Sequence, residues 1–177
     1  MFDLNFKSGL FCLLGSLGLL LGACEAQEET VADYANCRYE KPEAIFYPEL
    51  PQISDHQFHD KGAGSEESFI LSGGVAVSIL QYGCDQRTQE FAFELGGASP
   101  CDTPAACTKQ AAQLFLALSR LGPEYHVFRV WSHAIRDISD QVRFGASLQL
   151  GEGFWIKVDK KEGSGRTTLL LTLSENA

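Results

Sequence analysis

The amino-acid sequence predicts an α+β domain in which an antiparallel sheet of about five strands, in the order β-β-β-α-α-β-β, has a helical hairpin on one face. The alternation of apolar and polar residues that is typical of strands occurs before residue 96 and again after residue 147. Two apolar stripes at helical spacing lie between these regions. Short glycine-containing turns join neighbouring strands, which favours hairpins and therefore antiparallel pairing.

Three strands are expected between residues 66 and 95. The first is Ser68–Ser72, and Gly73-Gly74 fits a tight turn into a second strand that is nearly apolar on both faces. The third strand begins at Arg87 and alternates cleanly. Its core-facing residues are Phe91, Phe93 and Leu95, and its solvent-facing residues are Thr88, Glu90 and Glu94.

Two helices follow the loop of residues 96–107. Thr103 is expected to be an N-cap, with Pro104 in the first helical position. Gly122-Pro123 ends the first helix, and the same proline can open the second. The apolar stripes are Ala111, Leu114, Phe115, Leu118 and Leu121 in the first helix, and Tyr125, Phe128, Trp131, Ile135, Ile138 and Val142 in the second. Because the link is very short, the helices should pack side by side or bend sharply apart.

The last strands are expected at 148–159 and 167–174, joined by a hairpin loop at 160–165. Since each strand has mainly one apolar face, the sheet should be covered on one side only. The open face is expected to carry Glu90, Glu94, Trp155 and Lys157, which are the candidate interaction residues. Glu90 and Glu94 are interpreted as solvated residues rather than as a catalytic acid pair.

The first 24 residues have the parts of an export signal. Lys7 gives a charged start, residues 9–21 are apolar or small, and Gly22-Ala23 precedes Cys24. The apolar run is shorter than the roughly 20 residues of a membrane span. Leu21-Gly22-Ala23-Cys24 resembles the lipobox of bacterial lipoproteins. The resemblance implies cleavage before Cys24, a diacylglycerol on its sulfur and acylation of the new amino terminus. The alternative is an ordinary secretory signal that ends in a chance cysteine.

This resemblance divides the chain into a signal peptide (1–23), a lipidated acidic tether (24–36) and a single domain (37–177). Glu25 follows the modified cysteine, and the aspartate that the family associates with inner-membrane retention is absent there. The family pattern therefore favours the periplasmic side of the outer membrane, if the host is Gram-negative. Cleavage would leave 154 of the 177 residues, which is enough for one domain.

The chain is acidic, with a formal net charge of −9. The signal contains one lysine and one aspartate, so its removal leaves this charge unchanged. An acidic chain repels phosphate backbones, which argues against a nucleic-acid partner. It also has no polybasic attraction to anionic lipid, so the amino-terminal lipid would hold it at the membrane.

Four cysteines remain in the domain: Cys37, Cys84, Cys101 and Cys107. An even number in an exported domain indicates disulfides, and three pairings are possible. The sequence favours Cys101–Cys107 as a local bond and Cys37–Cys84 as a long-range one. The sequence contains no Cys-x-x-Cys pair, so the cysteine spacing gives no indication of a zinc site. A redox-active Cys101–Cys107 pair is the functional alternative.

Residues 39–51 contain three prolines and are expected to be extended along the domain, pinned by Cys37. Residues 55–60 are interpreted as a polar loop anchored by Phe58. His56 and His59 within it are candidates for a metal site. A larger histidine site would also require His126 and His133 of the second helix to converge on this pair.

No nucleophile motif such as Gly-x-Ser-x-Gly is present, and no cofactor is expected. The preferred hypothesis is a lipid-anchored envelope module that binds another envelope protein without catalysis, for example as an inhibitor of a basic hydrolase such as lysozyme. One alternative is a histidine-based, metal-dependent enzyme or factor. Another is a carrier of lipid or another apolar ligand, which requires a pocket of ~300 Å³ or more lined by Phe91, Phe93, Phe115 and Phe128.

Overall fold

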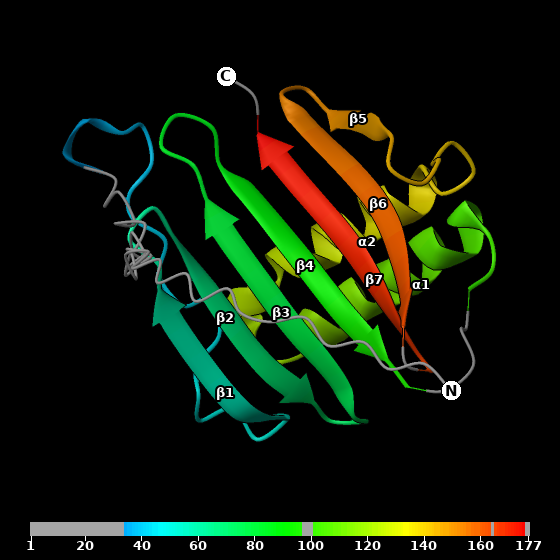
Figure 1. Cartoon of the computed structure of the whole chain (residues 1–177), viewed down its shortest axis with the longest axis horizontal. Coiled ribbons are helices and arrows are strands. Elements are labelled where there is room, and N and C mark those ends of the chain that lie inside the picture. The colour runs from blue at the N-terminus through cyan, green and yellow to red at the C-terminus, as the bar shows by residue number, and fades with distance from the viewer. Residues whose placement is uncertain (1–33, 97–100, 164, 176–177) are drawn as a thin grey trace, which may run out of the picture.

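The computed structural model describes residues 34–96, 101–163 and 165–175. These residues form one antiparallel sheet of seven strands and two α-helices, which lie behind the sheet in the view of Figure 1. The strands are β1 (Ile53–Asp60), β2 (Gly64–Leu71), β3 (Val75–Tyr82), β4 (Thr88–Leu95), β5 (Ser147–Gly151), β6 (Phe154–Gly163) and β7 (Arg166–Glu175). The helices are α1 (Pro104–Leu118) and α2 (Val127–Asp137), with two short 3-10 helices, η1 (Tyr34–Asn36) and η2 (Pro123–Tyr125). The predicted α+β class with an antiparallel sheet is confirmed.

The strand order in the sheet is β1-β2-β3-β4-β7-β6-β5. Strands β1 to β4 follow one another as a meander, and the last three strands return in the opposite order on the far side of β4. The chain passes through α1 and α2 between β4 and β5. The sheet therefore has β4 and β7 near its centre and β1 and β5 at its edges (Figure 1).

The core lies between the sheet and the two helices. Phe91 and Phe93 of β4 are completely buried, and so is Phe115 of α1. The ring centroids of Phe91 and Phe115 are 4.9 Å apart, and those of Phe91 and Phe128 are 6.0 Å apart. These rings fill the layer between sheet and helices, as the alternation in β4 and the helical stripes predict.

The start of α1 is the predicted cap. Thr103 Oγ1 accepts a hydrogen bond from the backbone N–H of Ala106 at 3.2 Å, and Pro104 occupies the first turn. The start of α2 differs from the prediction, because Pro123 opens η2 and the α-helix begins four residues later. The two helices are joined by a buried hydrogen bond that Ser132 Oγ donates to the carbonyl oxygen of Ala112 at 2.7 Å.

The prediction of about five strands was too low, and the first missed strand is β1. Residues 55–60, interpreted as a polar loop, belong to this edge strand, which pairs with β2. Only two of its eight residues, Ile53 and His56, are even partly buried, so the sequence shows no alternation there. A register shift between Ser54 and Gln57 disturbs the pattern further.

The second missed strand comes from residues 148–159, which were predicted as one strand and form parts of β5 and β6. The turn between them is Glu152-Gly153, where Gly153 has φ +75°. A two-residue turn by itself shifts the phase of the alternation, but the pairing of β5 with β6 also shifts register between Gln149 and Gly151 and restores it. Leu148 therefore faces the same side as Ile156, and the sequence pattern runs through the turn without a break. The predicted hairpin loop at 160–165 is also shorter than expected, because β6 continues to Gly163.

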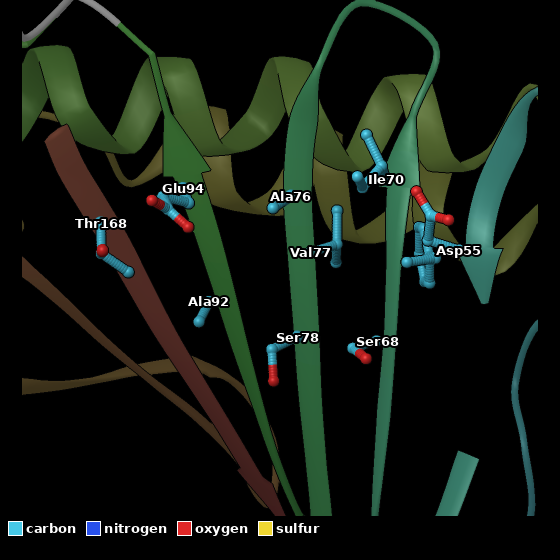
Figure 2. Close-up of a pocket in the computed structure, with 10 residues that line it drawn as sticks. Asp55, Ser68, Ile70, Ala76, Val77, Ser78, Ala92, Glu94 and Thr168 are labelled. Atoms are coloured by element: carbon cyan, nitrogen blue, oxygen red, sulfur yellow. The ribbon is translucent and has the colours of Figure 1, made fainter. Parts of the chain in front are cut away.

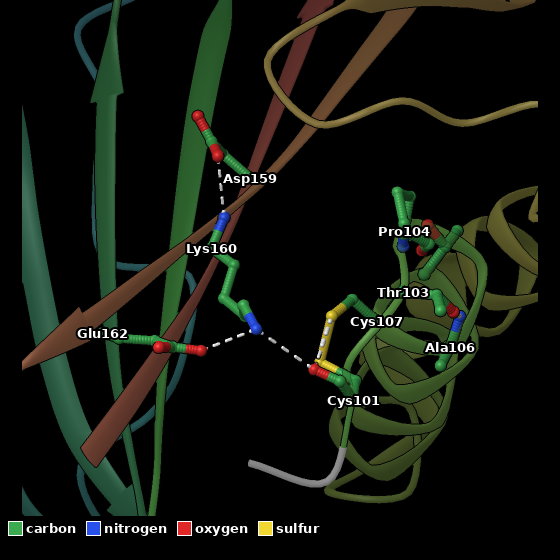
Figure 3. The surroundings of a disulfide bond; sticks show 9 residues. Cys101, Thr103, Pro104, Ala106, Cys107, Asp159, Lys160 and Glu162 are labelled. Carbon is green, nitrogen blue, oxygen red and sulfur yellow. Dashed lines mark hydrogen bonds and ion pairs between the residues drawn. A yellow bond between two sulfur atoms is a disulfide. The ribbon is translucent and has the colours of Figure 1, made fainter. Parts of the chain in front are cut away.

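Both disulfides of the favoured pairing are present, Cys37–Cys84 and Cys101–Cys107. The first joins the segment before the sheet to the turn after β3. The second ties the loop before α1 to the first turn of that helix (Figure 3). Beside it, Lys160 Nζ of β6 donates a hydrogen bond to the carbonyl oxygen of Cys101 at 3.4 Å and pairs with Glu162 at 2.7 Å.

The predicted signal peptide, Cys24 and the tether as far as residue 33 lie outside the described residues. The last three residues of the predicted tether form η1. Among the residues that the structure describes, no helix combines the length and the hydropathy that a membrane span needs.

Candidate interaction site

Residues 37–50, called the strap here, run along the helix-facing side of the sheet and are fixed by buried polar side chains. Glu67 of β2 is completely buried, and its carboxylate oxygens accept hydrogen bonds from the backbone N–H groups of Ile45 (2.8 Å) and Phe46 (2.9 Å). Gln81 of β3 donates to the carbonyl oxygen of Glu43 at 2.8 Å. The strap is therefore held by its backbone, and its Phe46 ring enters the core.

The candidate metal residues His56 and His59 do not share a site. His56 Nε2 lies 2.8 Å from Glu67 Oε1 on the helix-facing side, and the imidazole is almost buried. Phe58 pairs with Glu67 and His59 pairs with Glu66, so His59 lies on the opposite face from Glu67. Residues three apart share a face of a helix but lie on opposite faces of a strand. Since residues 56–59 belong to strand β1, the two histidines point to opposite sides of the sheet.

The other two histidines lie on α2 or at its start. His133 Nδ1 is 3.3 Å from Arg136 Nη2, and both side chains are exposed. Across residues 34–96, 101–163 and 165–175, no three His, Cys, Asp or Glu side chains are arranged to hold a metal ion. The geometry gives the metal-dependent alternative no support within these ranges.

The face of the sheet away from the helices carries the four predicted interaction residues. Glu90 pairs with Thr172, which pairs in turn with Lys157, so Glu90 and Lys157 lie in one cross-strand row on the same face. Trp155 and Glu94 share this face through the same alternation. We call this surface the open face.

A depression in the open face, called the hollow, has a volume of about 340 Å³. It lies over β2, β3, β4 and β7 (Figure 2). Ser68, Ser78 and Ala92 form a cross-strand row of small side chains along its floor. The labelled residues around it are Asp55, Ser68, Ile70, Ala76, Val77, Ser78, Ala92, Glu94 and Thr168. The hollow is not evident from any single strand, and its signal in the sequence is the small residues at alternating positions of three neighbouring strands.

Charged groups of both signs surround the hollow. Asp55 and Glu94 line it, and Arg166 forms an ion pair with Glu94. Further from the hollow, Tyr82 Oη of β3 donates a 2.6 Å hydrogen bond to Glu90 of β4. Burial first, and then this hydrogen bond, raise the pKa of Tyr82 to about 12. On β6 the same face carries Lys157, Asp159 and Lys161.

A second concave surface, called the groove, lies between α2, the strap and the ends of β4 and β7. It consists of two adjoining pockets that share Arg87, Gln89 and Trp131, and the larger has a volume of about 340 Å³. The Trp131 ring packs against Phe154, with centroids 5.5 Å apart. The remaining lining residues are Ile45, Tyr47, Glu124, Tyr125, Val127, Phe128, Leu173, Ser174 and Glu175.

The four phenylalanines named for the carrier alternative pack on one another. Phe115 lies 4.9 Å from Phe91, 6.0 Å from Phe93 and 5.8 Å from Phe128, measured between ring centroids. All four side chains are buried. Their rings therefore fill the space between them, and of the four only Phe128 also lines the groove described above.

Protein-family models, curated proteins and solved structures were compared with the chain, and none of them matches it.

Proposed function

We propose that this protein is a lipid-anchored, non-catalytic binding module of the bacterial cell envelope, which binds another envelope protein through the open face of its sheet. The lipobox-like residues Leu21-Gly22-Ala23-Cys24 support the anchor. The two disulfides agree with an oxidising compartment outside the cytoplasm. In this proposal the two helices act as a hairpin that supports the sheet from behind, and the outer membrane, on its periplasmic side, is the location.

The observation that carries the proposal is the hollow. Its volume of about 340 Å³ is large enough for a side chain of a partner, and its floor is made of small side chains that leave the backbone accessible. An apolar side chain inserted there would be removed from water by Ile70, Ala76 and Ala92. The carboxylate of Asp55 at the rim would accept a charge-assisted hydrogen bond from a neighbouring lysine or arginine of the partner.

The partner class follows from this chemistry and from the charge. A chain with a net charge of −9 attracts basic proteins and accelerates their association at low salt. We therefore expect a basic envelope protein that presents an apolar residue beside a lysine or arginine. A basic hydrolase such as lysozyme, inhibited by the module, is one example of this class.

Photo-cross-linking in living cells tests the proposal. A benzophenone amino acid replacing Ser78, in the floor of the hollow, should give a covalent adduct with one basic protein. The same amino acid replacing Ser72, which is exposed in the turn after β2, is the control and should not give that adduct. Absence of an adduct at Ser78, or the same adduct from both positions, would contradict the proposal.

A matched pair of substitutions tests the hollow itself. Ser78→Phe fills it, whereas Gln113→Phe places the same ring at an exposed position of α1, away from the open face. For the partner identified by cross-linking, Ser78→Phe should weaken binding about tenfold or more, which corresponds to about 1.4 kcal/mol. Gln113→Phe should leave the affinity within about threefold of wild type, because it lies outside the proposed contact. Equal losses would show that the hollow is not the contact.

A further inference from the structure

The amino-terminal part of the described chain passes beside the groove at Tyr39. The backbone N–H of Tyr39 donates a hydrogen bond to the carbonyl oxygen of Cys84 at 3.1 Å, next to the Cys37–Cys84 disulfide. The guanidinium of Arg87, a lining residue of the groove, lies 4.8 Å from the centroid of the Tyr39 ring. An amino-terminal tether would join the domain at Tyr34, whose hydroxyl donates to the carbonyl oxygen of Ala63 at 2.8 Å, and five residues later the chain passes this surface.

The length of that tether limits how far the domain can lie from an anchor. Ten residue steps separate Cys24 from Tyr34. A fully extended chain covers at most 3.3–3.6 Å per residue, so these steps span about 35 Å or less. A bilayer that holds an acylated Cys24 would thus stay within reach of the groove, and a weak second contact would become effectively intramolecular.

The rim of the groove has the side chains that a bilayer interface accepts. Val130 and Tyr47 are 64% and 61% exposed, and Val127 and Phe154 are also exposed. Val127, Val130, Trp131 and Ala134 follow helical spacing and form a second apolar stripe on α2, separate from the one that faces the core. Trp and Tyr are enriched at membrane–water interfaces, because one end of each ring is apolar and the other polar.

We propose that this rim, formed by Tyr47, Val127, Val130, Trp131 and Phe154, docks onto the lipid bilayer at interface depth. The inference rests on the lipid anchor of the proposed function. Since Glu124 and Glu175 also line the groove and the chain is acidic, the contact is apolar and does not require anionic lipid. Docking in this way places the helices toward the membrane and leaves the open face, on the other side of the sheet, accessible to a protein partner (Figure 1).

The two tryptophans of the chain allow a direct test, because Trp131 lies in the groove and Trp155 on the open face. The full chain, processed in bacteria, is reconstituted on phosphatidylcholine vesicles that contain brominated acyl chains. Trp155→Phe leaves only Trp131, and Trp131→Phe leaves only Trp155. Bromine should quench the fluorescence of Trp131 at least about twofold more than that of Trp155, as expected for a side chain that enters the boundary between headgroups and acyl chains.

Two charge substitutions in the Trp155→Phe background test the surface. Val130→Glu should lower the quenching of Trp131 to the level of Trp155. Gln113→Glu adds the same charge at an exposed position of α1 outside the groove and should have no effect. Both positions are exposed, so the fold should tolerate both changes.

Intact mass of the same samples separates the two proposals. If the lipid is present on Cys24 and Trp131 is quenched no more than Trp155, the docking surface is wrong and the anchor stands. If Trp155 is quenched more, the open face is the one toward the membrane, and the docking surface is again wrong. If the mass shows no lipid, the anchor fails and the docking inference fails with it.

Discussion

Glu67 and His56 form a buried pair in which Glu67 Oε1 lies 2.8 Å from His56 Nε2. The same carboxylate accepts the backbone N–H groups of Ile45 and Phe46, so one side chain joins the edge strand β1, strand β2 and the strap. A carboxylate without exposure is stable only when such donors surround it. The pair therefore has a structural role in this fold.

Replacing Glu67 should be among the most destabilising single changes in the sheet. Glu67→Ala leaves two backbone donors and an imidazole without their acceptor, and should lower the free energy of unfolding by about 3–5 kcal/mol. Glu67→Gln keeps one acceptor oxygen and should lower it less. Glu66→Ala, on the opposite face, removes only an exposed ion pair with Lys61 and should change stability by less than about 1 kcal/mol. Urea unfolding measures all three, and equal effects of Glu67→Ala and Glu66→Ala would contradict this role.

Ionisation of the Tyr82 phenol should destabilise the folded protein at alkaline pH. The pKa of Tyr82 is raised from 10.0 to about 12, so the folded state favours the neutral phenol. This contribution is complete below pH 10 and disappears as the pH rises toward 12. The ultraviolet titration of phenolate should show one tyrosine near 12, and Tyr82→Phe should remove it.

Glu90→Gln separates the two causes of the Tyr82 shift. Burial is the larger cause, so the pKa of Tyr82 should fall after this substitution but stay above 10. A return of the pKa to the ordinary value would show that Glu90 alone raises it.

The two disulfides should contribute unequally to stability. On the chain-entropy model, the Cys37–Cys84 bond, which closes a loop with a sequence separation of 47, contributes about 4 kcal/mol. Cys101–Cys107, with a separation of 6, contributes about 2 kcal/mol. Calorimetry of the two double-serine variants tests the order, and a larger loss on removing Cys101–Cys107 would contradict it.

The sequence predicted the fold where burial imposed a pattern. The alternation in β4 follows from one face packing on the helices, so Phe91, Phe93 and Glu94 were placed correctly. The edge strand β1 has no buried face to impose such a pattern, and polar edges of this kind protect sheets from pairing with other chains. Its histidines were consequently interpreted as part of a loop.

The candidate surfaces were predicted only in part. The open face and its four charged or aromatic candidates follow from strand periodicity. The hollow and the groove do not, because each depends on which strands become neighbours in space, and the order β4-β7-β6 cannot be read from residues that are distant in the chain. Trp131 packs against the core, as its helical spacing predicts, but that spacing gives no sign that its ring also lines the groove beside Phe154.

The anchor at Cys24 is the claim on which the envelope location and the docking surface both depend, and intact mass spectrometry of the full chain from bacterial membranes tests it most directly. The account predicts a chain that begins at Cys24 and carries a diacylglycerol and an acylated amino terminus, and a Cys24→Ala variant that lacks both. An unmodified chain that still begins at Met1 would contradict it.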